Sequence, residues 1–265
     1  MSEIVTRVSL KALFRSPFQG TKWQNNFIIG SLFAFGNFII PIIPLIFVAG
    51  YCLQLMRQAI QGLGPTELPE WNDWGRLFVD GARMLGVSFI YLLPGFVVLV
   101  GGMALYFVGS FSLPVLTAFG QENSGPSAAF PLLFLFLMAV FMLSLLVGFV
   151  LIALGAIPLP AATAHFAAKD HFGSAFQLGE WWPLLRVNKL GYLIAFVIVF
   201  GLYFILSFVL MMAYYTIILC FLVPFLAAPI LFYLAVISAT LFGQTYRESQ
   251  DMLAPAALQS EPAAA

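Results

Sequence analysis

Residues 190–243 read LGYLIAFVIVFGLYFILSFVLMMAYYTIILCFLVPFLAAPILFYLAVISATLFG and contain no charged side chain. A helix needs about 20 consecutive apolar residues to cross a bilayer. The stretch is therefore long enough for two membrane-spanning helices, with a tight turn expected near Ala213–Thr216. This uncharged pair predicts that the chain folds in a membrane.

The composition of the whole chain agrees with a membrane protein. Of its 265 residues, 62% are hydrophobic and only 8% are charged, whereas about a quarter of the residues in a soluble domain are charged. We therefore expect the lipid bilayer to surround most of the surface. The net charge is zero, which gives no general attraction to nucleic acid, so nucleic acid is not expected as a partner.

The first apolar block, residues 23–56, allows two interpretations. It would hold one span comfortably, and two spans only as short helices. Gly36, Asn37 and Pro41 lie in its middle, where a hairpin would turn, and such residues commonly interrupt helices.

The eleven Lys and Arg residues decide between one span and a hairpin. With one span the cations divide four against seven between the two sides, whereas with a hairpin all eleven share one side. Cytoplasmic loops carry the excess of Lys and Arg, so we predict a hairpin and cytoplasmic N- and C-termini. The cations lie in four segments: Arg7, Lys11, Arg15 and Lys22; Arg57, Arg76 and Arg83; Lys169, Arg186 and Lys189; and Arg247.

Together these features predict an all-α fold, a polytopic membrane helical bundle with interfacial amphipathic helices. It would have about six membrane-embedded helices, of which the first two form a short hairpin. Residues 1–22 are expected to form an interfacial segment, 23–247 the membrane domain and 248–265 a disordered tail. The spans are predicted at about 23–39, 42–60, 84–108, 130–157, 190–212 and 217–242.

The most distinctive polar segment is the Trp-rich stretch that precedes the third predicted span. Pro69 and Glu70 suit the first turn of a helix, which is expected to lie at the membrane interface. Such a helix would serve either to support the bundle or to dock a partner or a lipid headgroup. The candidate docking residues are Trp71, Trp74, Arg76, Asp80, Trp181 and Arg186.

The sequence offers little for catalysis. His165 and His171 are six residues apart, which is not the spacing that puts two metal ligands on one helical face. The predicted spans lack a central ionisable residue, which ion-coupled transporters usually keep there. We therefore predict no catalytic residue, no cofactor, no metal site and no enzymatic activity.

Several short motifs of this chain resemble a known family. They are Gly50-Tyr51, Leu68-Pro69-Glu70-Trp71, Asp73-Trp74 and Asp80-Gly81. The chain is similar, over residues 4–245, to the prokaryotic membrane proteins of domain-of-unknown-function family 4013. The resemblance implies a multi-span integral membrane protein and brings no catalytic residues with it.

Two functional hypotheses follow from these features. The first is a non-enzymatic scaffold, assembly or lipid-organising component of the prokaryotic cytoplasmic membrane, which is the plasma membrane of the cell. Its partners would be lipid and either another membrane protein or a second copy of the chain. The alternative is a permease or the membrane subunit of a transport system, which predicts a polar cavity lined by Asn37 or Tyr214.

Overall fold

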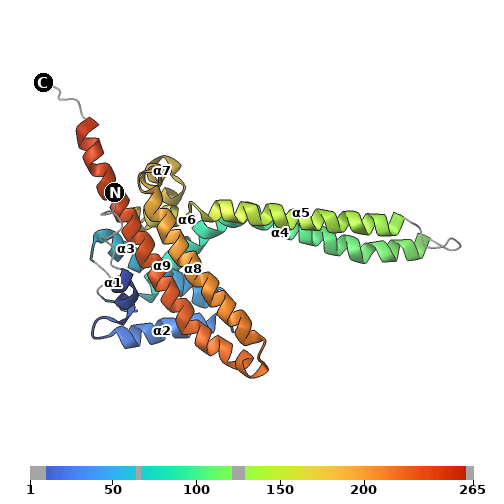
Figure 1. Ribbon diagram of the computed structural model, residues 1–265, viewed down its shortest axis with the longest axis horizontal. Helices are drawn as coiled ribbons and strands as arrows, with labels where there is room; N and C mark the ends of the chain where they lie inside the picture. Colours follow the sequence, from blue (N-terminus) through green and yellow to red (C-terminus); the bar gives the residue numbers. More distant parts are fainter. Residues whose placement is uncertain (1–9, 64–66, 121–128, 261–265) are drawn as a thin grey trace. The chain divides into compact units, whose positions relative to one another are not determined.

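The computed structural model describes residues 10–63, 67–120 and 129–260. All regular secondary structure in these residues is helical (Figure 1), which confirms the predicted all-α fold. The chain divides into two compact units, residues 1–87 with 160–265, and residues 88–159. Each unit is described by itself below.

The first unit is a bundle in which α9 packs against α2, α3 and α8. Its buried centre includes Tyr51, Trp71 and Phe232, which expose 5% of their surface or less. The helices are α1 (Leu10–Arg15), α2 (Trp23–Gly36), α3 (Ile43–Gln61), the first turns of α4 (Trp74–Gly120), α6 (Leu159–Lys169), α7 (Leu178–Val187), α8 (Lys189–Tyr214) and α9 (Ile217–Ser260), with short 3₁₀ helices η2 (Ser16–Phe18) and η3 (Phe172–Phe176).

Both predicted turns are present. The backbone N–H of Ile42 donates to Oδ1 of Asn37 at 3.3 Å, and this bond closes the turn between α2 and α3. α8 ends at Tyr214 and α9 begins at Ile217, as the uncharged pair predicted. The hairpin interpretation of the first apolar block is therefore confirmed.

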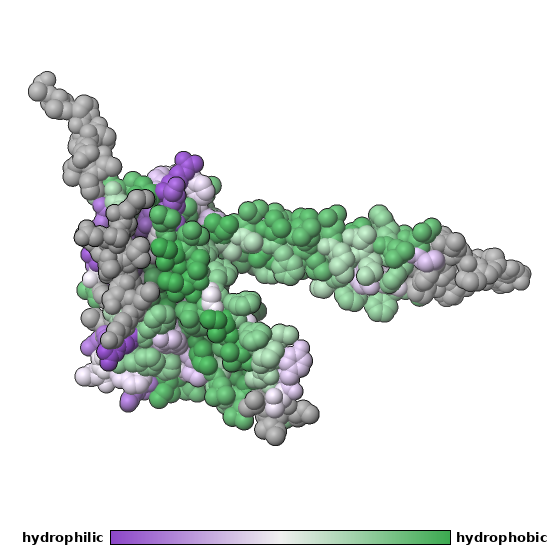
Figure 2. Space-filling model, viewed as in Figure 1, coloured by the Kyte–Doolittle hydropathy of each residue, from purple (hydrophilic) through white to green (hydrophobic). Residues whose placement is uncertain are grey.

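The helices indicate a membrane protein by their length and composition. Among the described residues, five segments are long and apolar enough to cross a bilayer: Ile43–Gln61, Trp74–Ser112, Pro131–Lys169, Lys189–Tyr214 and Phe221–Ala254. α2 has 14 residues, or about 21 Å of helix, which is shorter than the hydrocarbon core. Figure 2 shows apolar side chains covering the visible faces of α5 and α8.

The second unit is an antiparallel hairpin formed by the rest of α4 and by α5 (Ala129–Ala156). Gly95, Gly102 and Gly109 lie seven residues apart on α4, and a side chain at any of them would collide with α5. Ser144 and Gly148 lie on the facing side of α5, as small residues at such contacts allow backbones to approach closely. Small residues on both helices therefore allow α4 and α5 to pack closely in this hairpin.

Several predicted boundaries differ from the structure. α4 extends well beyond residues 84–108: the uncharged residues 109–120 continue the helix at one end, and the first turns from Trp74, with Arg76, Asp80 and Arg83, continue it at the other. Residues 248–260 continue α9 instead of forming a disordered tail. Ser249 is fully buried there and donates to the backbone oxygen of Thr245 at 2.8 Å, so packing extends the helix into this segment. Of the predicted interfacial segment 1–22, residues 1–9 lie outside the described part of the chain.

Candidate functional site

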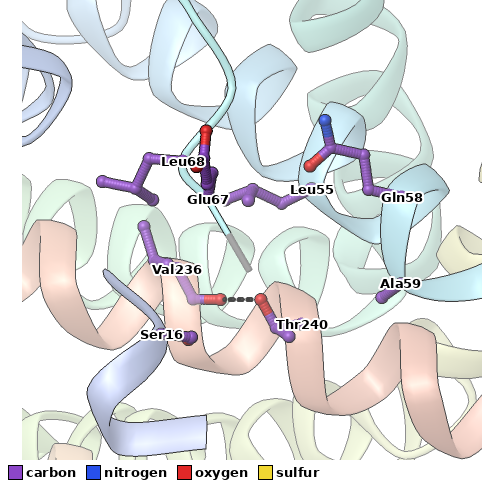
Figure 3. Close-up of a pocket in the computed structure, with 8 residues that line it drawn as sticks. All are labelled: Ser16, Leu55, Gln58, Ala59, Glu67, Leu68, Val236 and Thr240. Atoms are coloured by element: carbon purple, nitrogen blue, oxygen red, sulfur yellow. Dashed lines mark hydrogen bonds between the residues drawn. The ribbon is translucent and has the colours of Figure 1, made fainter. Parts of the chain in front are cut away.

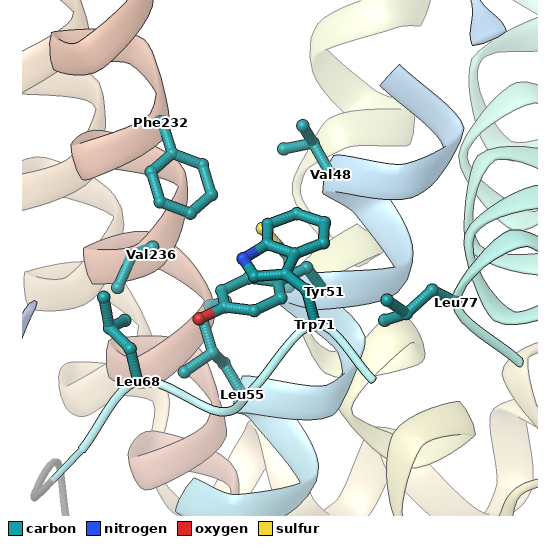
Figure 4. Packing of buried hydrophobic residues seen from close by; sticks show 10 residues of the cluster. Val48, Tyr51, Leu55, Leu68, Trp71, Leu77, Phe232 and Val236 are labelled. Carbon is teal, nitrogen blue, oxygen red and sulfur yellow. The ribbon is translucent and has the colours of Figure 1, made fainter. Parts of the chain in front are cut away.

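The Leu-Pro-Glu-Trp motif forms an extended segment that packs against α2 and α3 and is hydrogen-bonded to them. The indole ring of Trp71 lies between two rings, stacked on Tyr51 at 4.2 Å and on Phe33 at 5.4 Å between centroids. Figure 4 shows the Tyr51 and Trp71 rings face to face beside Phe232. The Trp71 Nε1–H donates to the backbone oxygen of Asn26 at 3.0 Å, and the Tyr51 hydroxyl donates to that of Pro69 at 2.9 Å. The motif therefore holds the loop before α4 in place.

Two glycines from the other family motifs, Gly50-Tyr51 and Asp80-Gly81, allow α3 and α4 to cross closely. A side chain at Gly50 would collide with the backbone oxygen of Leu77, and one at Gly81 with the backbone oxygen of Ile46. Backbones in such close contact leave no space for even a methyl group. These glycines therefore fix where the first turns of α4 lie against α3.

The helix that we predicted to begin at Pro69 begins at Trp74 instead. Oδ1 of Asp73 accepts from the backbone N–H of Arg76 at 3.0 Å, the bond of an N-terminal helix cap. The residues before Asp73 are extended because the Trp71 ring and the Pro69 carbonyl are tied to α2 and α3. The predicted separate interfacial helix is thus an extended loop followed directly by α4.

Four charged side chains form a network at the start of α4. Arg57 of α3 pairs with Asp80 of α4, and its other terminal nitrogen lies 2.6 Å from Oδ1 of Asp170. Arg76 lies 3.6 Å from Asp80 and 3.8 Å from Asp170. Asp80 is only 5% exposed, and burial of such a carboxylate requires a cationic partner. Because Asp170 follows Lys169, the network joins the second and third cationic segments.

Contacts within the first unit bring all four cationic segments together. Lys22, from the N-terminal segment, lies 2.6 Å from Oε1 of Glu70, and this ion pair raises the pKa of Lys22 and lowers that of Glu70. The guanidinium of Arg247, from the tail, lies directly against Gly62 at the C-terminus of α3. The four cationic segments therefore lie within one unit, while their common side of the membrane stays a prediction.

A polar cleft of about 540 Å³ lies beside this network, a volume within the usual range of ligand sites. One wall is the polar face of α3, another is the loop before α4, and the third is formed by the first turns of α4. The lining residues are Gln54, Arg57, Gln58, Gln61, Leu63, Pro69, Glu70, Asn72, Asp73, Arg76, Leu77 and Asp80. We take this polar cleft as the candidate functional site.

The glutamines of the cleft were missed in the sequence. Gln54, Arg57, Gln58 and Gln61 follow the i, i+3, i+4, i+7 spacing of one helical face. A polar stripe of this kind at the end of an apolar helix is the signal that could have identified these glutamines in the sequence. It predicts a polar contact along that face, although it does not show what lies opposite.

The six predicted docking residues do not form one exposed surface, because three of them are buried and three are exposed. Trp71, Trp181 and Asp80 are buried, at 5%, 0% and 5% exposure, and serve the packing of the first unit. The exposed members are Trp74, Arg76 and Arg186, of which Arg186 lies 5.5 Å from the ring of Trp182. The exposed Arg76 and the buried Asp80 meet in the cleft, and the docking role stays a prediction.

A second polar cluster joins α6, α7 and α9. His165 is 3% exposed, with Nδ1 2.7 Å from the Tyr246 hydroxyl and Nε2 3.0 Å from Oε2 of Glu180. Lys169 lies 3.5 Å from the same carboxylate. The bond from His165 is the main reason that the pKa of Glu180 lies below its usual range. Both ring nitrogens of His165 are therefore used in joining the helices.

A small cavity between α3 and α9 is lined by Ser16, Gln58, Glu67 and Thr240 among others (Figure 3). Its volume is about 10 Å³, enough for about one water molecule. Ser16 and Thr240 donate to backbone oxygens within their own segments. This cavity is too small for a substrate.

Comparison with known families agrees with the motifs described above. Residues 33–215 match the family model described as Protein of unknown function (DUF4013). The chain belongs to this family. The searches of the curated proteins and of the solved structures found no match. The DUF4013 match includes all three walls of the polar cleft, so the family region contains the whole candidate site.

Proposed function

We propose that this DUF4013 protein is a non-enzymatic component of the prokaryotic cytoplasmic membrane that organises lipid or assembles with a membrane partner. Both termini would lie in the cytoplasm, because the joined cationic segments favour the anionic inner leaflet. The polar cleft is the observation that carries the proposal. It offers polar and charged groups beside helices whose outer faces are apolar.

The carboxylates of the cleft already have partners within the protein, which favours ligand binding over acid–base catalysis. Asp80 pairs with Arg57, Glu70 with Lys22, and Asp73 caps α4. A general acid or base needs a group that is free to exchange a proton with a substrate. Carboxylates engaged in this way are better suited to positioning and recognition.

A transport role is the second candidate, favoured by the short α2 and its hairpin turn. Asn37, however, is bonded into that turn. Tyr214 lines a shallow depression with Ser207, Leu210, Met211 and Tyr215, which is mostly apolar. Asn37 and Tyr214 therefore give little support to a polar path across the membrane. The polar cleft gives more support to a binding role.

The proposal is tested by extracting the protein with its surrounding membrane in polymer-bounded discs. We expect the discs to be enriched in a lipid class or a membrane partner relative to the bulk membrane. Arg76→Glu should remove this enrichment, while Arg83→Glu, outside the cleft, should keep it. Circular dichroism checks that both variants are folded. Discs that match the bulk membrane, or that do not change with Arg76→Glu, would contradict the proposal.

A further inference from the structure

The charged groups of the cleft are not all used by the protein itself. Arg57 holds both Asp80 and Asp170 through short contacts, and Arg76 supplies the second positive charge that balances these two carboxylates. Arg76 contacts the same carboxylates at 3.6 and 3.8 Å, which is longer than a hydrogen bond. Its side chain is 60% exposed. Arg76 therefore keeps its guanidinium donors available for an oxyanion, and a phosphate suits their fork geometry.

Acceptor groups line the same cleft as Arg76. Oδ1 of Asp73 caps α4, and Oδ2 has no partner among the described residues. The side-chain amides of Gln54, Gln58 and Gln61 line the same cleft without a side-chain partner in the described part of the chain. A primary ammonium has three N–H donors, which match one carboxylate oxygen and several amide oxygens.

The lining distinguishes between kinds of ammonium group. A quaternary ammonium has no N–H donor and is usually held by aromatic rings. The described lining residues of the cleft include no aromatic ring and several hydrogen-bond acceptors. The cleft is therefore suited to a primary ammonium.

The lining of the cleft is not entirely polar. Leu63 and Leu77 line it, and Leu63 is 61% exposed whereas Leu77 is 4% exposed. A ligand whose polar head occupies the cleft can place an apolar chain against Leu63. This exposed apolar side chain beside the charged groups favours a lipid over a free solute.

We infer that the polar cleft binds the headgroup of a membrane lipid that carries both a phosphate and a primary ammonium, as phosphatidylethanolamine does. The phosphate binds Arg76, and the ammonium binds Asp73 and the glutamine amides. This inference rests on the proposed lipid-organising function and names its ligand.

The test measures which lipids the purified full-length protein retains in detergent, by native mass spectrometry. Phosphatidylethanolamine, phosphatidylcholine and phosphatidylglycerol with the same acyl chains are supplied in competition. We expect about tenfold stronger retention of phosphatidylethanolamine than of phosphatidylcholine, since one charge-assisted contact contributes about this factor. Equal retention of the two lipids would overturn the inference.

Two variants assign the two halves of the headgroup. Asp73→Asn keeps a good capping residue and removes the carboxylate charge, so it should abolish the preference for ethanolamine over choline. Arg76→Gln should weaken retention of both lipids alike, since both contain a phosphate. Arg83→Gln is the matched control and should retain lipid as the native chain does. A preference that survives Asp73→Asn contradicts the assignment, and circular dichroism verifies that each variant is folded.

Soluble phosphoethanolamine separates a lipid from a free solute. If it displaces the retained lipid only weakly, the acyl chains contribute and the lipid assignment holds. If it competes as well as the lipid does, the ligand is the free headgroup and the lipid assignment is wrong. Discs that stay enriched in an Arg76-dependent manner, without an ethanolamine preference, would keep the proposed function and remove only this inference.

Discussion

In the first unit, the apolar windows on α3 and α9 are 50% and 39% buried inside the chain and that on α8 is 17% buried, whereas 17% of the window within Pro131–Lys169 and 11% of that within Trp74–Ser112 are buried. The first unit is held by an interior of stacked rings, ion pairs and interhelical hydrogen bonds. The α4–α5 hairpin of the second unit is held by one line of small residues and by the stacking of Tyr106 on Phe141, and most of its large apolar side chains face outward. The first unit can therefore fix its own arrangement, while the hairpin depends on its surroundings.

Removal of the central ring of the first unit should have the largest effect. Trp71→Ala should lower the free energy of unfolding by about 3–5 kcal/mol, because a buried indole and two stacked contacts are lost. Trp182→Ala, at a ring that is 40% exposed, should cost less than about 1 kcal/mol. Thermal unfolding in detergent, followed by circular dichroism, measures both. Similar losses for the two variants would show that the Trp71 loop does not hold the unit together.

A methyl group at the α3–α4 crossing should have the next largest effect. Gly81→Ala should destabilise the protein by about 1–3 kcal/mol, because the new atom meets backbone that has little room to move. Gly75→Ala, in the same helix, would bring the new methyl only into ordinary contact with Oδ1 of Asp73 at 3.7 Å, and should be neutral or stabilise by up to about 1 kcal/mol. The same unfolding assay compares them. A stabilising Gly81→Ala would contradict the close crossing.

The matching experiment in the hairpin should give a smaller change. A methyl at Gly102 meets Oγ and Cβ of Ser144, so α4 and α5 must separate slightly, but the nearest backbone atom is 3.7 Å away. Gly102→Ala should therefore cost about 1 kcal/mol. The neighbouring Gly101 has nothing within contact distance, and Gly101→Ala serves as the control. Unfolding is measured in detergent and in nanodiscs. A loss at Gly102 larger than that at Gly81 would reverse the comparison between the units.

The smallest effect concerns the contact between His165 and Glu180. The pKa of Glu180 in the folded protein lies below its usual value of 4.5. The contact therefore stabilises the fold above that value and is lost as the pH falls through the lower, folded-state pKa. Glu180→Gln should lower the unfolding temperature at neutral pH, and its difference from the native chain should shrink as the pH falls below 4.5. A difference that is constant with pH would exclude this role for the carboxylate.

The charge pattern and the apolar runs of the sequence predicted the helical architecture well. The hairpin at Asn37 and the turn after Tyr214 follow from helix breakers and from the length that a span requires. The contacts that bring the cationic segments into one unit agree with the distribution of Lys and Arg along the sequence. That distribution was the argument for the hairpin. These features depend on local composition and on the energetic cost of placing charge in lipid.

The helix expected at Pro69 shows what local patterns could not predict. Pro69 and Glu70 suit the start of a helix, but Trp71 stacks on Tyr51 and Phe33, and these rings belong to other helices. The long-range stacking outweighs a local preference of a few tenths of a kcal/mol per residue. Residues 248–260 differ for a related reason, since Ser249 is buried within the first unit.

The candidate site was only partly visible in the sequence. Arg76 and Asp80 were recognised, whereas the glutamine stripe on α3 and the cluster around His165 were not. Asp170 and Glu180 follow their partners Arg57 and His165 in the chain by 113 and 15 residues. Spacing within one helix cannot show a pair that only the packing of several helices creates.

The sequence alone determined that this chain is helical, where its helices can cross a bilayer, and which segments carry its positive charge. Each of these follows from the local match between side chains and solvent. Only the tertiary structure decided that Trp71 is a buried packing residue, that Gly50 and Gly81 form a helix crossing, and that the polar face of α3 meets α4 in a cleft. Those outcomes depend on contacts between distant segments, whose geometry is set by packing of the whole unit.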